Sequence, residues 1–133
     1  MRYIGLNSRE YKLNLTEFLP KTDKKSSLHL NVREFLKSNF PLEQILEEVS
    51  INGFPKNKTL YLDFLLPISK IIVEAHGQQH CSHISFFHSN KVKFLLAKNN
   101  DRLKKEWANL NGFTLYEFYW NESEEQWIIK LKT

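Results

Sequence analysis

The chain has 133 residues, 41% of them hydrophobic, with 19 basic and 15 acidic side chains and a formal net charge of +4. This composition is typical of one globular domain and excludes a disordered chain. No apolar run has the length of a membrane helix, and the first residues lack the apolar core of a secretory signal. The single cysteine, Cys81, forms no intrachain disulfide, so we expect a cytoplasmic protein in a reducing compartment. Because no membrane helix is predicted, we expect no membrane partner.

Residues 1–27 are interpreted as an N-terminal extension of one main domain, residues 28–133. Residues 3–6 and 11–15 have the composition of two short strands. The lysine-rich loop 21–27 is either a solvated connector, which we favour, or a basic arm that contacts phosphate.

A helix is predicted over residues 28–39, with Ser27 as its N-cap. Its apolar stripe is expected to consist of Leu28, Val32, Phe35 and Leu36. A strand is predicted over residues 44–51, where alternation places Glu47 on the same face as Ile45, Val49 and Ile51. Glu47 is therefore a carboxylate on an apolar stripe, unless it reaches solvent at an edge.

The strongest pattern in the sequence is a hairpin of two strands over residues 60–76, because apolar and polar side chains alternate on both sides of a proline-containing turn. If Leu66 pairs with Ile71, the antiparallel register places Asp63 directly opposite Glu74. The hairpin thus predicts that two carboxylates lie together on apolar-rich strands.

Two like charges that face each other destabilise a sheet, and burying them is costly unless a positive group lies between them. A divalent cation such as Mg²⁺ or Mn²⁺ is the usual answer, since it prefers carboxylate oxygens and keeps several waters. Asp63 and Glu74 are therefore candidate metal ligands, with the backbone carbonyl near Ala75 as a further one. His76 lies two residues beyond Glu74 and is expected on the same face.

Histidine and cysteine residues gather after the hairpin, namely His76, His80, Cys81, His83 and His88. Zinc takes these side chains, but their spacing matches no strong zinc template. We therefore do not expect a structural zinc.

Residues 91–111 predict a long helix. Its apolar face is expected to consist of Val92, Leu95, Leu96, Leu103, Trp107 and Leu110. Lys98, Arg102 and Lys105 are candidate contacts with DNA phosphates, although they could also form plain solvent surface. The same periodicity places Asp101 opposite the apolar face.

Gly112 is expected to stop this helix, an aromatic strand follows over residues 113–120, and a capping box at residues 121–124 opens a final helix. The order is helix, three strands, helix, strand, helix. The fold class predicted is α/β, with a mixed β-sheet flanked by helices.

Asp63 followed by residues 74–76 resembles the core of the PD-(D/E)XK nucleases. Residues 76–80 resemble the glycine-and-histidine segment of the branch near the very-short-patch repair endonucleases, and residues 100–115 resemble its helix, glycine and final strand. The chain departs from the family pattern at two places. His76 stands where lysine is usual, and no proline precedes Asp63.

The resemblance implies a restriction-endonuclease-like core and Mg²⁺- or Mn²⁺-dependent hydrolysis of phosphodiester bonds in duplex or branched DNA. The site residues that it implies are Asp63, Glu74, His76, His80, Glu34 and Asp101. Glu47 is the rival of Glu34 as a third acid, and either His76 or His80 is the candidate catalytic histidine.

Three functions follow from these patterns. The favoured one is a metal-dependent DNA endonuclease, because both acids of the motif are present at the expected offset. The alternatives are a catalytically inactive nucleic-acid-binding relative of the same fold and a small zinc-stabilised interaction protein. A monomer and a homodimer fit the sequence equally well.

Overall fold

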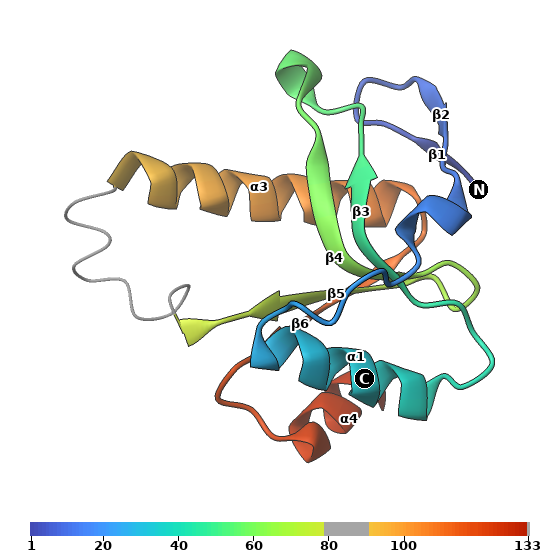
Figure 1. Cartoon of the computed structure of the whole chain (residues 1–133). Coiled ribbons are helices and arrows are strands. Elements are labelled where there is room, and N and C mark those ends of the chain that lie inside the picture. The colour runs from blue at the N-terminus through green and yellow to red at the C-terminus, as the bar shows by residue number, and fades with distance from the viewer. Residues whose placement is uncertain (79–90, 133) are drawn as a thin grey trace.

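The computed structural model describes residues 1–78 and 91–132 of the chain. Helices cover both faces of a four-stranded mixed sheet, and a two-stranded hairpin stands beside it (Figure 1). The elements are β1 (Arg2–Ile4), β2 (Glu10–Lys12), the 3-10 helix η1 (Leu15–Phe18), α1 (Ser27–Asn39), β3 (Leu46–Ile51), the 3-10 helix η2 (Pro55–Asn57), β4 (Leu60–Leu66), β5 (Ile71–His76), α3 (Lys91–Leu110), β6 (Thr114–Tyr119) and α4 (Glu124–Lys132). None of the helices in these described ranges has the length and apolar character needed to span a membrane.

The strand order of the sheet is β3-β4-β5-β6. β4 pairs antiparallel with both β3 and β5, whereas β6 pairs parallel with β5. The chain passes along α3 between these two parallel strands, as a crossover connection requires. The predicted α/β class and the pairing of Leu66 with Ile71 are both confirmed.

Each face of the sheet has its own core. On the α3 side, Leu62, Leu65 and Ile72 pack with Trp107. On the other side, Phe64 and Val73 pack with residues of α1 and α4. The core on the α3 side also contains residues of the N-terminal segment, which therefore belongs to the same packed body as the rest of the chain; they are Tyr3 and Leu13.

The predicted alternation of β3 is wrong at one point. Glu48 has a left-handed backbone, with φ of 50°. Val49 and Ile51 consequently lie in the core on the α3 side, whereas Glu47 contacts α1 on the other side. Glu47, which the sequence placed on one face with Val49 and Ile51, therefore lies on the other face of the sheet.

The helix ends follow local side-chain chemistry. The cap of α1 is Ser26 and not Ser27, because the Ser26 hydroxyl accepts the His29 backbone N–H at 3.1 Å. At the start of α4, the Ser123 hydroxyl accepts the Gln126 backbone N–H and the Gln126 side-chain Oε1 accepts the Ser123 backbone N–H. This reciprocal pair is a capping box, but Ser123 and Gln126 form it, whereas the sequence placed it at residues 121–124.

The predicted apolar face of α3 is only partly buried. The buried residues of this helix are Leu103, Trp107 and Ala108. Four residues of the predicted apolar face are each more than half exposed, namely Val92, Leu95, Leu96 and Leu110. The reason is geometric, since the first half of α3 extends beyond β3 and β4 (Figure 1).

Candidate active site

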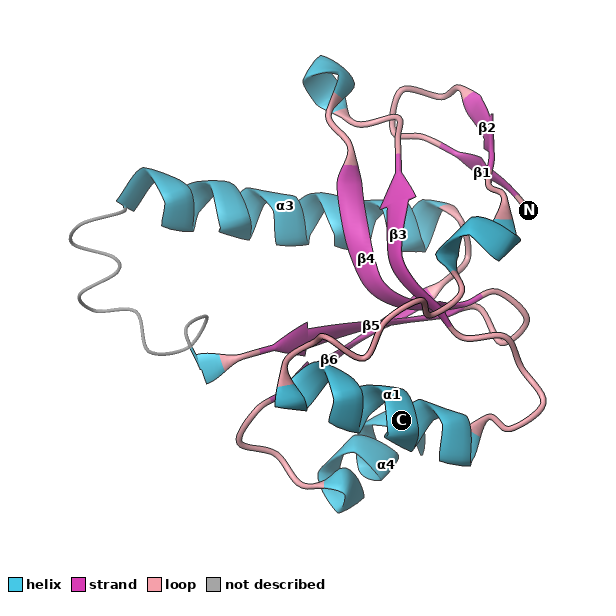
Figure 2. Cartoon of the chain, viewed as in Figure 1, coloured by secondary structure: helices cyan, strands magenta, loops and turns pink. Residues whose placement is uncertain are grey.

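The candidate site lies where β4 and β5 separate. The two strands meet at their turn and diverge toward the start of β4 and the end of β5 (Figure 2). Their ladder ends at the pair formed by Phe64 and Val73. Asp63 and Glu74 would form the next pair in this register, so they are the first residues beyond the ladder.

Side chains replace the backbone pairing at this point. The Asp63 backbone N–H donates to Glu74 Oε2 at 2.8 Å, and the Ala75 backbone N–H donates to Asp63 Oδ2 at 2.8 Å. Each carboxylate therefore accepts a hydrogen bond from the opposite strand. This exchange fixes both acids in the gap between the strands, and the predicted proximity of Asp63 and Glu74 is borne out by these bonds.

A lysine of α3 contacts the pair of acids. Lys104 Nζ bonds to Glu74 Oε1, and the two side chains are only 15% and 6% exposed. The sequence analysis did not single out Lys104. The available signal was its spacing, because residues three and four apart share a helix face and Trp107 and Ala108 are buried.

The electrostatics of the pair are unbalanced. Burial and the Asp63 charge together raise the pKa of Glu74 to about 7, although the Lys104 ammonium acts in the opposite direction. Glu74 is thus protonated up to a higher pH than an exposed glutamate. The pair retains negative charge that one lysine does not fully offset.

His76 lies on the α3 side of β5 but contacts another acid. Its Nε2 is 3.3 Å from Glu117 Oε1 on β6, and its ring stacks on Tyr119 with centroids 4.9 Å apart. The hydrogen bond with Glu117 raises the pKa of His76, and the charges of Asp101 and Glu74 add to that effect. The imidazole is therefore protonated over a wider pH range than an exposed histidine.

Asp101 shares a helix face with Lys104 and Lys105, which contact Glu74 and Glu117, although the helical periodicity placed it opposite the predicted apolar face. It is partly buried, and its charge acts on His76. Lys105 Nζ lies 3.8 Å from Glu117 Oε2. The predicted orientation was wrong because the first half of α3 buries little of its apolar face, so that face does not mark the side nearest the sheet.

The three basic candidates of α3 have exposed positions. Arg102 bonds to Glu106 and Asn99, and Lys98 lies over the Phe94 ring. Arg102 and Lys105 also line a shallow groove of about 550 Å³ between α3 and β6. They are accessible to an anionic partner, but the contacts with Glu106 and Glu117 already offset part of their charge.

The two candidates for a third acid lie elsewhere. The Glu34 side chain is 71% exposed and pairs with Lys37 on the surface of α1. Glu47 is buried, but both of its oxygens accept hydrogen bonds from Arg33. The structure therefore brings neither acid to the Asp63–Glu74 pair.

His80, with the zinc candidates Cys81, His83 and His88, lies outside the described residues.

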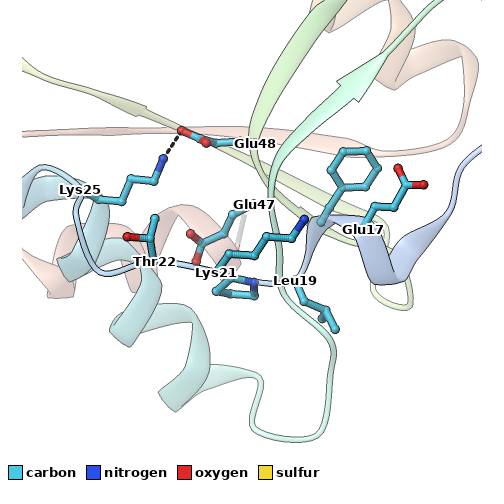
Figure 3. Close-up of a pocket in the computed structure, with 9 residues that line it drawn as sticks. Glu17, Leu19, Lys21, Thr22, Lys25, Glu47 and Glu48 are labelled. Carbon is cyan, nitrogen blue, oxygen red and sulfur yellow. Dashed lines mark hydrogen bonds and ion pairs between the residues drawn. The ribbon is translucent and has the colours of Figure 1, made fainter.

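Glu47 belongs to a buried ionic cluster. It accepts Arg33 Nε and His29 Nε2, each at 2.7 Å. Arg33 also donates to Asp23 Oδ1 and to the Thr22 carbonyl, which holds residues 19–25 over β3. Figure 3 shows this segment beside Glu47, with Lys25 paired to Glu48, around a cavity of about 260 Å³. The contacts of this cluster are those of a structural tether between α1, β3 and the preceding loop.

The donor set at Asp63 and Glu74 fits a hard cation. Within residues 1–78 and 91–132, no group of three or more histidine, cysteine or acidic residues is arranged to hold a metal. Mg²⁺, however, commonly uses one or two protein carboxylates and keeps its remaining waters. The incompletely balanced charge of this pair is what such a cation would offset.

Protonation of Glu74 gives a pH test of this geometry. Its pKa is 4.5 in an unfolded chain and about 7 in the folded protein. A raised pKa contributes stability at low pH that is lost as pH rises, so the free energy of unfolding without metal should fall by roughly 3 kcal/mol between about pH 5 and pH 8.

Urea unfolding at a series of pH values measures this slope, and Glu74→Gln is the matched variant because it cannot ionise. The slope should become much shallower in Glu74→Gln, with the remainder due to His76. Adding Mg²⁺ at pH 8 should restore stability to the wild type alone. An equal slope in both proteins would contradict the burial and repulsion described for Glu74.

Comparisons with protein-family models, with curated proteins and with solved structures find no match to this chain.

Proposed function

We propose that this chain is a metal-dependent DNA endonuclease. The observation that carries the proposal is the buried Asp63–Glu74 pair in the gap between two diverging strands, with Lys104 against it. Two carboxylates and an ammonium group in one place are the groups that metal-assisted phosphodiester hydrolysis uses. The resemblance of the same residues to the PD-(D/E)XK core supports the proposal independently of the geometry.

In this proposal, Asp63 and Glu74 hold Mg²⁺ or Mn²⁺, with the Ala75 carbonyl as a third candidate ligand. The bound cation supplies Lewis-acid polarisation of the phosphate and a more acidic water. The reciprocal hydrogen bonds of the two strands keep both carboxylates in place before metal or DNA arrives. The acids therefore need little rearrangement on binding.

Lys104 takes the role that the family gives to the lysine after the glutamate. Its ammonium favours the ionised form of Glu74, and it can donate to a water or a phosphate oxygen beside that carboxylate. His76 is engaged with Glu117 and Tyr119 instead. It keeps a positioning role on the α3 side, near the phosphates of the DNA.

This assignment predicts unequal effects of two substitutions. Lys104→Met should lower cleavage by roughly a hundredfold or more, since it removes a positioned proton donor and leaves Glu74 more protonated. His76→Ala should have a smaller effect. The rate at saturating DNA and Mg²⁺ is the measurement, and Lys37→Met, which removes an exposed lysine of α1, is the control. A larger loss in His76→Ala than in Lys104→Met would reverse the assignment.

A nuclease assay tests the proposal directly. Purified protein with Mg²⁺ is incubated with plasmid, linear duplex, single-stranded and branched DNA, and an EDTA sample serves as the control. We expect Mg²⁺-dependent cleavage of duplex or branched DNA. Binding to DNA without cleavage of any of these substrates would favour the second candidate function, a catalytically inactive nucleic-acid-binding protein.

A further inference from the structure

A cavity of about 370 Å³ opens beside Asp63. Asp63 and Ala75 of the hairpin line it, together with Ser26 and His29 near the start of α1. Gly77, Gln78 and Trp120 line it as well. Its volume is within the range of small-molecule sites, about 300–1,000 Å³. A ligand in this cavity would lie next to the Asp63–Glu74 pair.

Trp120 is the exceptional residue of this wall. Its side chain is 44% exposed, whereas Trp107 and Trp127 are buried in the two cores. Its backbone is nevertheless fixed, because the Trp120 N–H donates to the His76 carbonyl at 3.0 Å. A partly exposed indole on a fixed backbone, lining a cavity, is suited to stacking with a planar group.

We propose that this pocket accepts an unpaired nucleobase of the DNA, stacked on Trp120, so that the protein prefers DNA with an unpaired nucleotide beside the bond it cuts. The inference rests on the proposed function and names its substrate class. A paired base is held within the duplex and cannot enter a pocket, so the base must be unpaired or extruded. Any of the four bases can stack, because each has a π-face.

The surroundings of the pocket fit a nucleotide rather than a neutral apolar ligand. Lys24 is exposed and lies two residues before Ser26, which lines the pocket. In this proposal its ammonium contacts the phosphate of the same nucleotide. Asp63 also lines the pocket. The base would occupy the cavity while its phosphate extends toward the acid pair.

Binding without cleavage, in EDTA, separates this inference from catalysis. The probes are a fluorescently labelled short duplex, the same duplex with one bulged thymidine, and the same duplex with an abasic bulge. The wild type should bind the bulged thymidine roughly tenfold more tightly than either other probe. Trp120→Ala should lose this preference, whereas Trp120→Phe should retain most of it. Tyr61→Ala, which removes an exposed tyrosine of β4, is the matched control and should behave as the wild type.

Intrinsic tryptophan fluorescence gives a second readout, because Trp120 is the exposed indole and Trp107 and Trp127 are buried. The bulged thymidine should quench the wild type, and the quenching should vanish in Trp120→Phe. Equal affinity for the thymidine and abasic bulges would contradict the proposal that this pocket accepts a nucleobase. An unchanged preference in Trp120→Ala would contradict it as well. A Trp120-dependent preference without Mg²⁺-dependent cleavage would support the pocket and overturn the nuclease proposal.

Discussion

Replacing Asp63 with asparagine should reduce Mg²⁺-dependent cleavage by roughly a thousandfold or more, the largest loss we expect from one substitution. Asparagine has nearly the same size, and its amide oxygen can still accept the Ala75 N–H that Asp63 Oδ2 accepts at 2.8 Å. The fold should therefore persist. The lost feature is the negative charge, and with it one of the two carboxylates that hold the cation.

Loss of that charge also changes its neighbour. The Asp63 carboxylate helps to raise the pKa of Glu74, so this pKa should fall in Asp63→Asn and Glu74 should pair more tightly with Lys104. The variant is consequently expected to be at least as stable as the wild type at neutral pH without metal. A loss of activity combined with retained stability would locate the effect in the chemistry.

Calorimetry with Mn²⁺ and the plasmid cleavage assay measure the two parts of this prediction. Glu34→Gln is the matched control, because it also converts a carboxylate to an amide but at an exposed position on α1. It should bind Mn²⁺ and cleave DNA as the wild type does. If Asp63→Asn binds Mn²⁺ as well as the wild type, the metal site is not at this pair.

The hairpin that carries the acids could be predicted from the sequence because its signals are local. Alternation indicated both strands, and the proline-containing turn fixed the pairing of Leu66 with Ile71. The alternation was wrong in placing Leu62 and Phe64 on one face, since they lie in different cores. A capping box at the start of α4 was also predicted from local sequence, although Ser123 and Gln126 form it and not the ends of residues 121–124. Each of these features depends on neighbours in the chain.

The missed features depend on tertiary contacts. Lys104 reaches Glu74 across 30 positions of sequence, and its spacing from Trp107 and Ala108 becomes informative only once the buried side of α3 is known. Glu48 adopts φ of 50° without the glycine or asparagine that usually marks such a turn. Asp101 was misplaced because an apolar stripe indicates a core only where another element covers it.

The cluster of Glu47, Arg33 and His29 should dominate the stability of the fold. Glu47→Gln is expected to lower the free energy of unfolding by about 3–5 kcal/mol, because it leaves the Arg33 guanidinium, 5% exposed, without its main partner. Arg33→Met should have a similar effect by leaving Glu47 charged and buried. Either loss is a large part of the stability of an ordinary domain.

The pKa of Glu47 gives the pH dependence of this contribution. Burial acts to raise that pKa, but the hydrogen bonds from Arg33 and His29 more than offset it, and the pKa is lowered from 4.5. A lowered carboxyl pKa contributes stability that is present above about pH 5 and is lost as pH falls through the folded value. The wild type and Glu47→Gln should therefore converge in stability in acid.

Urea unfolding of both single variants and of Arg33→Met/Glu47→Leu forms a double-mutant cycle. The double variant should recover much of the lost stability, because an apolar pair leaves no buried charge without a partner. Exposed Glu34→Gln should change stability by less than about 0.5 kcal/mol. Single variants that unfold at the same urea concentration as the wild type would show that the cluster does not hold α1 to β3, despite the 2.7 Å bond between Arg33 and Glu47.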